Sequence, residues 1–265
     1  MAIRRILRGQ IPKDDIESVS REVCRRRDVP FESVRQLEAD NWLSIPCVVN
    51  EQLFVKIVTE QNSFVHALLT AGRNLGAFSS RSEGFFERFK EPVEMAEHDL
   101  EATRRIRDLG INAPEPIEVF EHEGYGVLVL EYLPDFETLD QLDSGAVERV
   151  TPDMFEALSL MHDDGLAHGD LRGENVLVVD DDLYFIDATK VNEAAIEDAR
   201  AYDIACALAA LQPLIGTHRA VEVASQFYSD EVLLESEAYL DFVNLRPDHD
   251  FDTLSVKGEI EKRVT

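Results

Sequence analysis

The sequence is poor in cysteine and lysine and lacks any long apolar run. Its three cysteines are far apart in 265 residues and show no CxxC or zinc-type spacing, so they indicate neither a disulfide framework nor a cysteine metal site. No stretch approaches the roughly 18 uninterrupted apolar residues of a membrane-spanning helix, and the N-terminus lacks the apolar core of a signal peptide. We therefore predict a cytoplasmic protein without a membrane partner.

Positive charge is also scarce. The chain carries 53 acidic side chains against 26 basic ones, a formal net charge of −27, and only six of the basic residues are lysine. The acidic residues are spread along the chain rather than gathered in a tail, which is typical of a surface that stays hydrated in concentrated salt. We predict a halophilic origin. A hydrophobic content of 45% at this length still predicts a folded chain, as one bilobal domain or two small ones.

The most informative stretch is HGDLRGEN, followed by an apolar run that ends in Asp187. Residues 176–179 and 183–186 predict two strands joined by an aspartate-rich turn. In such an antiparallel hairpin the residue entering the first strand lies beside the residue leaving the second, so Asn175 and Asp187 face one small volume. Asp170, upstream on a glycine-flanked loop, reaches its edge. Two oxygen ligands and a free carboxylate suit phosphoryl transfer assisted by Mg²⁺.

A structural alternative is an acidic hairpin with an Asx-type turn before it, a common feature of acidic proteins. That alternative does not require His168, Gly169 and Asn175 together, so we favour phosphoryl-transfer chemistry for this stretch.

The polar residues around this loop are predicted to support it. We expect His162 and His168 to be structural, and Asp203, in the first turn of an apolar helix, to accept hydrogen bonds from the loop amides. Thr151 and Pro152 predict the start of the helix that precedes the loop.

Upstream, Lys56 lies inside an apolar strand predicted over residues 53–58, and a lysine in such a strand needs a partner. The alternative is an edge-strand lysine that points to solvent. A helix is predicted over residues 92–109 and a hairpin over residues 116–132. Between the strand and the helix lies an insert, residues 59–91, which is longer than a plain connection needs.

Together these segments resemble RIO-type atypical protein kinases, particularly a short RIO-like group in halophilic archaea. The resemblance rests on the order of Lys56, a helix glutamate, a hinge, HGDLRGEN and FIDATKV over roughly residues 41–211. Three features favour this family over ordinary protein kinases. HGD replaces HRD, a long segment follows Lys56, and no APE-type segment follows Asp187.

The resemblance implies an α+β, protein-kinase-like bilobal fold that uses ATP with Mg²⁺ or Mn²⁺. It implies that Asp170 accepts the proton of the attacking hydroxyl, and that Asn175 and Asp187 hold the metal. It also implies that Lys56 bridges the α- and β-phosphates to a carboxylate on the following helix.

We predict Glu101 as this carboxylate partner, with Glu97 one turn earlier in reserve. The alternative for either glutamate is a surface ion pair within the helix. Glu131 and Leu133 mark the segment where a kinase hinge offers backbone groups to adenine.

Two features depart from the family pattern. Residues 40–52 contain no glycine, so the close approach of backbone to phosphate that glycine permits is missing before Lys56. The DFG-like triplet is Asp187-Ala188-Thr189, which keeps the metal ligand but not the packing phenylalanine. Both departures predict a slow or specialised kinase.

The first 35 residues differ from the remainder in carrying nine basic and six acidic side chains. An apolar face over residues 16–23 predicts one helix, which ends before Pro30, and residues 32–38 predict a second. The elbow of this helix pair holds three arginines, Arg25, Arg26 and Arg27. One hypothesis is that they contact RNA or DNA phosphates, and the favoured alternative is that they pair with the acidic body.

We therefore predict a basic N-terminal helical extension over residues 1–40, a small β-rich lobe over residues 41–132 and a helical lobe over residues 133–265. The predicted activity is metal-assisted transfer of the γ-phosphate of ATP by a Ser/Thr protein kinase or ATPase. A protein substrate or a ribosomal particle is the implied partner. One alternative is a small-molecule phosphotransferase that resembles the aminoglycoside or choline kinases, which also use HGD and a later aspartate. Another is a non-catalytic nucleotide-binding switch that docks through its N-terminal helices.

Overall fold

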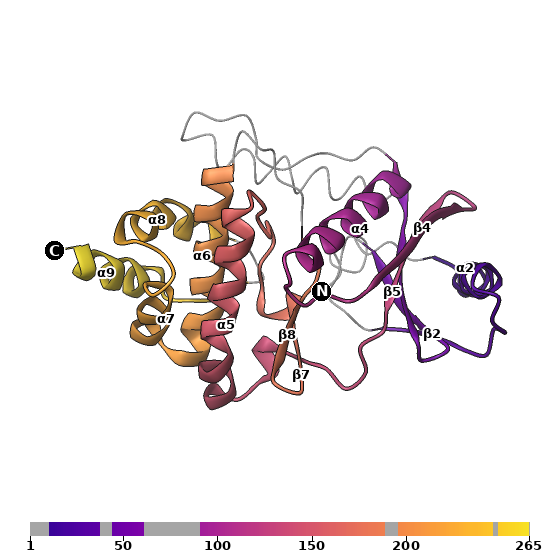
Figure 1. The fold of residues 1–265 in the computed structure, drawn as a ribbon, viewed down its shortest axis with the longest axis horizontal. Helices are drawn as coiled ribbons and strands as arrows, with labels where there is room; N and C mark the ends of the chain where they lie inside the picture. The colour runs from indigo at the N-terminus through magenta and orange to yellow at the C-terminus, as the bar shows by residue number, and fades with distance from the viewer. Residues whose placement is uncertain (1–10, 38–43, 61–90, 189–195, 246–248, 265) are drawn as a thin grey trace. The chain divides into compact units, whose positions relative to one another are not determined.

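The computed structural model describes residues 11–37, 44–60, 91–188, 196–245 and 249–264 (Figure 1). These residues form two units. The first contains a five-stranded antiparallel sheet, helix α2 and most of helix α4, and the second contains a three-stranded sheet and the remaining helices. No helix in the described ranges is long and apolar enough to cross a membrane. The insert predicted over residues 59–91 lies almost entirely outside these ranges.

The sheet of the first unit has the strand order β1-β2-β3-β5-β4. Its strands are β1 (Val34–Gln36), β2 (Ile45–Val49), β3 (Leu53–Val58), β4 (Pro116–His122) and β5 (Tyr125–Glu131). Along the interior strand β5, side chains alternate between the two faces, so that Val127 and Val129 join one core cluster while Leu128 and Leu130 join another. Because both faces are buried, the interior strands read as continuous apolar runs rather than as alternating ones.

Two helices bury these faces (Figure 1). Helix α2 (Lys13–Arg26) packs Val19 and its apolar neighbours against one core cluster of the sheet. Helix α4 (Pro92–Asp108) packs Ala96 and Leu100 against the other cluster. The first helix predicted from the N-terminal sequence is therefore confirmed, and its apolar face is part of the core of the first unit.

The predicted second helix of the N-terminal pair is wrong, because residues 34–36 form strand β1. This strand pairs with β2 in the register Val34↔Val49. The side-chain oxygen of Asn50 accepts a hydrogen bond from the backbone amide of Glu32 at 2.9 Å, which holds the approach to the strand. Pairing with a neighbouring strand overrides the weak helical pattern of these few residues.

The turn between β2 and β3 is built without glycine. Asn50 and Glu51 both have left-handed backbone angles, with φ of 54° and 52°. Asparagine tolerates this conformation better than most residues, whereas glutamate does not share that preference. The glycine-free segment at residues 40–52 thus contains a strand and a tight turn, while its residues 40–43 lie outside the described ranges.

The second unit is mostly helical, and its long helices α5 and α6 pack against each other (Figure 1). Its elements are β6 (Glu137–Thr138), η1 (Leu139–Gln141), α5 (Ser144–Asp163), η2 (Gly173–Asn175), β7 (Val176–Val179), β8 (Asp182–Phe185), α6 (Ile196–Ile215), α7 (Thr217–Ala224), α8 (Asp230–Asn244) and α9 (Thr253–Val264).

Helix α5 begins before the predicted start at Thr151. The carboxylate of Asp143 caps it by accepting a hydrogen bond from the backbone amide of Gly145 at 2.9 Å. Pro152 lies inside the helix, and the hydroxyl of Thr151 donates to the carbonyl oxygen of Val147 at 2.6 Å. The Thr-Pro pair is therefore an interior step of the helix and not its cap.

The predicted hairpin after HGDLRGEN is confirmed. Strands β7 and β8 pair in the register Val176↔Phe185, and Asp180 and Asp181 form the two-residue turn between them. Both aspartates have positive φ angles, 52° and 70°, as the favoured type of two-residue hairpin turn requires.

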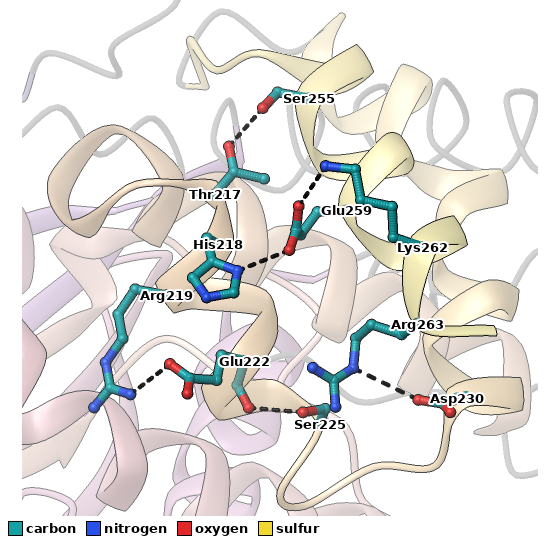
Figure 2. Close-up of polar contacts among 10 residues, drawn as sticks. All are labelled: Thr217, His218, Arg219, Glu222, Ser225, Asp230, Ser255, Glu259, Lys262 and Arg263. Carbon is teal, nitrogen blue, oxygen red and sulfur yellow. Dashed lines mark hydrogen bonds and ion pairs between the residues drawn. The ribbon is translucent and has the colours of Figure 1, made fainter. Parts of the chain in front are cut away.

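The last helix, α9, is joined to the preceding helices by polar side chains (Figure 2). Thr217 and Ser255 share a hydrogen bond of 2.8 Å, and Nδ1 of His218 lies 2.8 Å from Oε1 of Glu259. The hydrogen bonds of Glu259 with His218 and Lys262 hold the pKa of its carboxyl below the usual range. These contacts fix α9 on α7 within the second unit.

Candidate active site

Lys56 lies in β3 with only 4% of its surface exposed. Its Nζ donates to Oδ2 of Asp99 on α4 at a distance of 2.7 Å. A buried ammonium needs such a partner, because an unpaired charge in apolar surroundings is costly. The lysine is therefore held by a helix carboxylate within the first unit, which is the kind of pairing that the sequence predicts.

The carboxylate itself is Asp99 and not the predicted Glu101. Residues two positions apart on an α-helix differ in direction by about 200°, so these two side chains point to different sides of α4. Glu101 and the reserve candidate Glu97 are both exposed, whereas Asp99 precedes the buried Leu100. The prediction failed because the order of residues in the sequence does not fix which carboxylate of the helix faces β3.

The hinge residues predicted to contact adenine lie at the end of β5. The backbone amide of Glu131 donates to the carbonyl oxygen of Glu115 at 2.9 Å, and its carboxylate accepts from the amide of Glu115 at 3.1 Å. Leu133 follows as a buried residue. Because the amide of Glu131 is already bonded inside the unit, an adenine contact from Glu131 would have to use its carbonyl oxygen. The adenine contacts remain a prediction.

The HGD loop in the second unit is held by Asp203 of α6. This carboxylate has no exposed surface, and it accepts hydrogen bonds from the backbone amides of His168 at 2.6 Å and Gly169 at 2.7 Å. It also lies 3.2 Å from Nε2 of His162. The predicted hydrogen bonds from the loop amides to Asp203 are confirmed, and its carboxylate fixes the backbone of the loop immediately before Asp170. Its predicted place in the first turn is wrong, because α6 begins at Ile196 and Asp203 lies about two turns into the helix.

His162 extends this network to the core. Its Nδ1 lies 2.8 Å from the hydroxyl of Tyr228, so the imidazole bridges a tyrosine and the Asp203 carboxylate. Burial, together with the nearby negative charge of Asp203, raises the pKa of the Tyr228 hydroxyl well above its ordinary value. The predicted structural role of His162 is confirmed by this fully internal set of partners.

His168 braces the same loop from its other side. Its Nε2 lies 3.0 Å from the carbonyl oxygen of Ile186, and its Nδ1 lies 3.4 Å from the backbone amide of Asp170. A carbonyl can only accept and an amide can only donate, so these partners assign the proton to Nε2 of a neutral ring. Burial lowers the pKa of His168, which agrees with this neutral form. His168 therefore links the loop to Ile186, the residue that follows strand β8.

The loop then turns through Gly169, whose φ of +77° suits glycine. The side-chain amide of Asn175 donates to the carbonyl oxygen of Asp170 at 2.8 Å, which closes the loop on itself. The Asp170 side chain keeps 13% of its surface exposed, whereas Asn175 is almost completely buried. The structure thus fixes the backbone of Asp170 while its carboxylate reaches the surface of the unit.

The hairpin brings the backbone of Asn175 next to Ile186, the residue before Asp187, and the joint role of Asn175 and Asp187 as metal ligands stays a prediction. The backbone amide of Ile186 donates to the carbonyl oxygen of Asn175 at 3.0 Å, and Asp187 follows with a left-handed φ of 61°. An amide oxygen and a carboxylate are hard ligands, and Mg²⁺ in phosphotransfer sites uses few protein oxygens together with phosphates and water. The donor set therefore fits Mg²⁺ or Mn²⁺. In the part of the chain described, no group of three or more histidine, cysteine or acidic side chains is placed to hold a metal ion.

Sequence reasoning missed Arg172, which lies between these groups. Its Nε is 3.4 Å from Oδ2 of Asp170, its Nη1 is 3.2 Å from Oε2 of Glu174, and its Nη2 is 3.5 Å from Oδ1 of Asn175. The one available signal was that this arginine is the only basic residue in HGDLRGEN.

A RIO domain family model matches residues 77–208, which include the end of the insert, the HGD loop, the hairpin and the first part of α6. The chain belongs to the RIO family. Its fold agrees with this assignment, because a solved structure of the Rio2 kinase from Chaetomium thermophilum superposes with a TM-score of 0.53 and 15% sequence identity. That match covers 96% of this chain and 78% of the Rio2 chain. The predicted α+β, protein-kinase-like fold is confirmed.

Two further solved structures are more distant. A putative fructosamine-3-kinase from Haemophilus somnus 129PT has a TM-score of 0.44 at 12% identity, covering 93% of this RIO chain and 97% of its own. The PAN3 pseudokinase from Drosophila melanogaster has a TM-score of 0.43 at 14% identity, covering 88% and 66%. Both TM-scores lie below 0.5, so these two similarities are too weak to support an assignment of function. No curated protein matches the sequence.

Proposed function

We propose that this RIO-family chain is an ATP-dependent phosphotransferase that transfers the γ-phosphate of ATP with the help of Mg²⁺ or Mn²⁺, as a Ser/Thr protein kinase or an ATPase. One observation carries the proposal. The buried Asp203 carboxylate and His168 hold the HGD loop, and Asn175 ties this loop to the hairpin by donating to the carbonyl oxygen of Asp170 and accepting from the amide of Ile186, the residue before Asp187. A base candidate next to two metal-type ligands is the arrangement that phosphoryl transfer to a hydroxyl or to water requires.

Each residue then has a distinct role. Asp170 orients the attacking hydroxyl or water and accepts its proton, and His168 keeps the backbone of Asp170 in place. Asn175 and Asp187 would hold the divalent metal, which neutralises phosphate charge when it is bound. Lys56, oriented by Asp99, binds the α- and β-phosphates of ATP. Asp99 takes the role for which the sequence predicts Glu101.

The Rio2 kinase of Chaetomium thermophilum was crystallised as an ADP/Mg²⁺-phosphoaspartate complex. This supports ATP and Mg²⁺ as the ligands of the present chain. It also makes an aspartyl phosphate a product to search for here, alongside phosphoserine, phosphothreonine and free phosphate. An acyl phosphate is distinguished from a phosphoester because hydroxylamine cleaves it.

The test is incubation with γ-labelled ATP and Mg²⁺ in molar KCl, following protein-bound label and free phosphate together. We expect turnover by the wild type and its loss in Asp170→Asn, with ATP binding retained, because the amide cannot accept the proton. Undiminished turnover in Asp170→Asn would contradict the assignment of the base. Transfer to amino sugars or alcohols rather than protein would favour a small-molecule phosphotransferase, and ATP binding without turnover would favour a non-catalytic switch.

The proposed partner is a protein substrate or a ribosomal particle. The arginine elbow of α2 contributes little free charge to such contacts, because Arg25 pairs with Glu22 at 2.7 Å and Arg26 pairs with Glu118 at 2.8 Å. Arg26 also lies over the ring of Phe120, 4.3 Å from its centroid. An RNA contact would therefore depend mainly on Arg27, and a charge reversal at Arg27 with filter binding to RNA tests it.

A further inference from the structure

The guanidinium of Arg172 contacts both functional oxygens of the HGD loop. It lies 3.4 Å from the Asp170 carboxylate through Nε and 3.5 Å from Oδ1 of Asn175 through Nη2. The side chain is 16% exposed, so these contacts are formed in a largely dry environment where charge interactions are strong. Arg172 therefore lies between the proposed base and the proposed metal ligand.

The contact with Asn175 has a consequence for metal binding. The amide nitrogen of Asn175 is committed to the carbonyl oxygen of Asp170, so Oδ1 is the only side-chain atom of Asn175 that can bind a metal. That same oxygen faces Nη2 of Arg172. A divalent cation about 2.1 Å from Oδ1 would meet the guanidinium as a like charge. A cation at this oxygen is therefore opposed by the charge of Arg172 as long as the guanidinium stays in place.

The contact with Asp170 indicates where the guanidinium goes. In phosphoryl transfer the carboxylate of Asp170 and the transferred phosphate are both negative and approach each other. A guanidinium is the side chain best matched to a phosphate by charge and geometry. An arginine already beside Asp170 is placed to neutralise this repulsion and to bind the phosphoryl group.

We propose that Arg172 is a catalytic, phosphate-binding residue that also acts as a latch. Before nucleotide binds, its guanidinium contacts Oδ1 of Asn175 and opposes metal binding. When ATP and the metal bind together, the guanidinium moves from Asn175 to the γ-phosphoryl group. The inference rests on the proposed phosphotransferase function, and it adds that the free site selects the metal–nucleotide complex over the free metal.

The test compares Arg172→Gln with Arg149→Gln, an exposed arginine whose nearest acidic partner, Asp181, lies 3.7 Å away. Two readouts are needed. The first is Mn²⁺ binding without nucleotide, measured by electron paramagnetic resonance, and the second is steady-state turnover. We expect Arg172→Gln to bind free Mn²⁺ roughly tenfold more tightly, because a like charge is removed. We also expect its kcat to fall about 10²-fold with little change in KM for ATP, because the lost contact forms mainly in the transition state. Arg149→Gln should change neither.

A merely structural arginine would give a different pattern, because a loosened loop weakens Mn²⁺ binding and turnover together. That result, or unchanged kcat in Arg172→Gln, would overturn the proposal. Added guanidine should restore part of the turnover of Arg172→Ala but not that of Asp170→Asn, and failure of this rescue counts against a phosphate contact. If the wild type transfers no phosphate, the proposed function itself fails, and the Mn²⁺ readout still decides whether Arg172 opposes the metal.

Discussion

A single carboxylate organises the candidate site at the level of residues. Asp203 has no contact with solvent, and its two oxygens accept the amides of His168 and Gly169 while facing the ring of His162. Each of these donors is itself buried, so none can turn to water if the carboxylate is removed. The geometry of Asp170 therefore depends on a residue that has no direct role in the proposed chemistry.

Replacing Asp203 by Asn should destabilise the protein by about 3 kcal/mol, because an amide nitrogen facing the loop cannot accept from buried backbone donors. Denaturant unfolding followed by circular dichroism in KCl measures the change. Asp181→Asn is the matched control, because this aspartate lies in an exposed turn with φ of 70° where asparagine is tolerated. A loss below about 1 kcal/mol for Asp203→Asn would show that the network is dispensable.

His168 gives the protein a defined pH dependence. Burial lowers the pKa of His168 in the folded state below its value of about 6.5 in the unfolded chain. At a pH between these two pKa values, the unfolded chain binds more protons than the folded protein. The stability contributed by the neutral ring is therefore fully present above about pH 6.5 and is lost as the pH falls below it.

We expect the free energy of unfolding of the wild type to decrease from pH 7 to about pH 5 more steeply than that of His168→Gln, whose amide cannot be protonated in this range. Urea unfolding at a series of pH values gives both slopes. Equal slopes for the two proteins would mean that His168 is not the group responsible.

At the level of elements, the phase of α4 decides which acid meets Lys56. The buried Ala96 and Leu100 turn one stripe of the helix toward the sheet, and Asp99 lies at the border of that stripe. Glu101 lies on the exposed side. The pairing is thus a property of how the helix packs and not of the carboxylate alone.

Asp99→Asn should therefore lower kcat/KM for ATP by about 10- to 100-fold, the size of effect that losing an orienting outer-shell partner has at metal sites. Glu101→Gln is the control and should leave it unchanged. The comparison is made by initial-rate kinetics at varied ATP. A larger effect of Glu101→Gln would mean that the helix shifts its phase when nucleotide binds.

These elements also show what the sequence can predict. The β7–β8 hairpin and the contact of Asn175 with the Ile186–Asp187 step follow from local signals, an apolar run, a two-residue turn and a second apolar run. Lys56 could be recognised because a lysine is costly inside an apolar strand. Such features depend on residues close in sequence.

Other elements depend on distant partners. The strand Val34–Gln36 has only three residues, and its conformation comes from pairing with β2. The places of Asp99 and Arg172 in the site come from their contacts. These contacts depend on the phase of a helix and on the conformation of a loop, and neither follows from composition. The start of α5 was misplaced because Asp143 supplies a stronger cap than Thr151, whose hydroxyl bonds back inside the helix.

For the whole molecule, the net charge of −27 is the dominant property. Self-repulsion of this size opposes the folded state at low ionic strength and is screened as salt is added. The melting temperature should therefore rise steadily as KCl is increased from about 0.1 M toward molar concentrations. Differential scanning fluorimetry measures this rise, and a neutral osmolyte at equal osmolality is the control. A melting temperature that is independent of KCl would remove the argument for a saline environment.

Helix α2 has a practical consequence for any shortened form of this chain. A protein begun at residue 41 would lose both α2 and β1, leaving Val49, Val55 and Val129 without their cover and β2 as an open edge. An exposed apolar face and an open strand edge both promote association, so such a fragment would aggregate. The N-terminal helix is thus needed for solubility. A chain without it would misfold, so an effect of its loss on activity could not be measured.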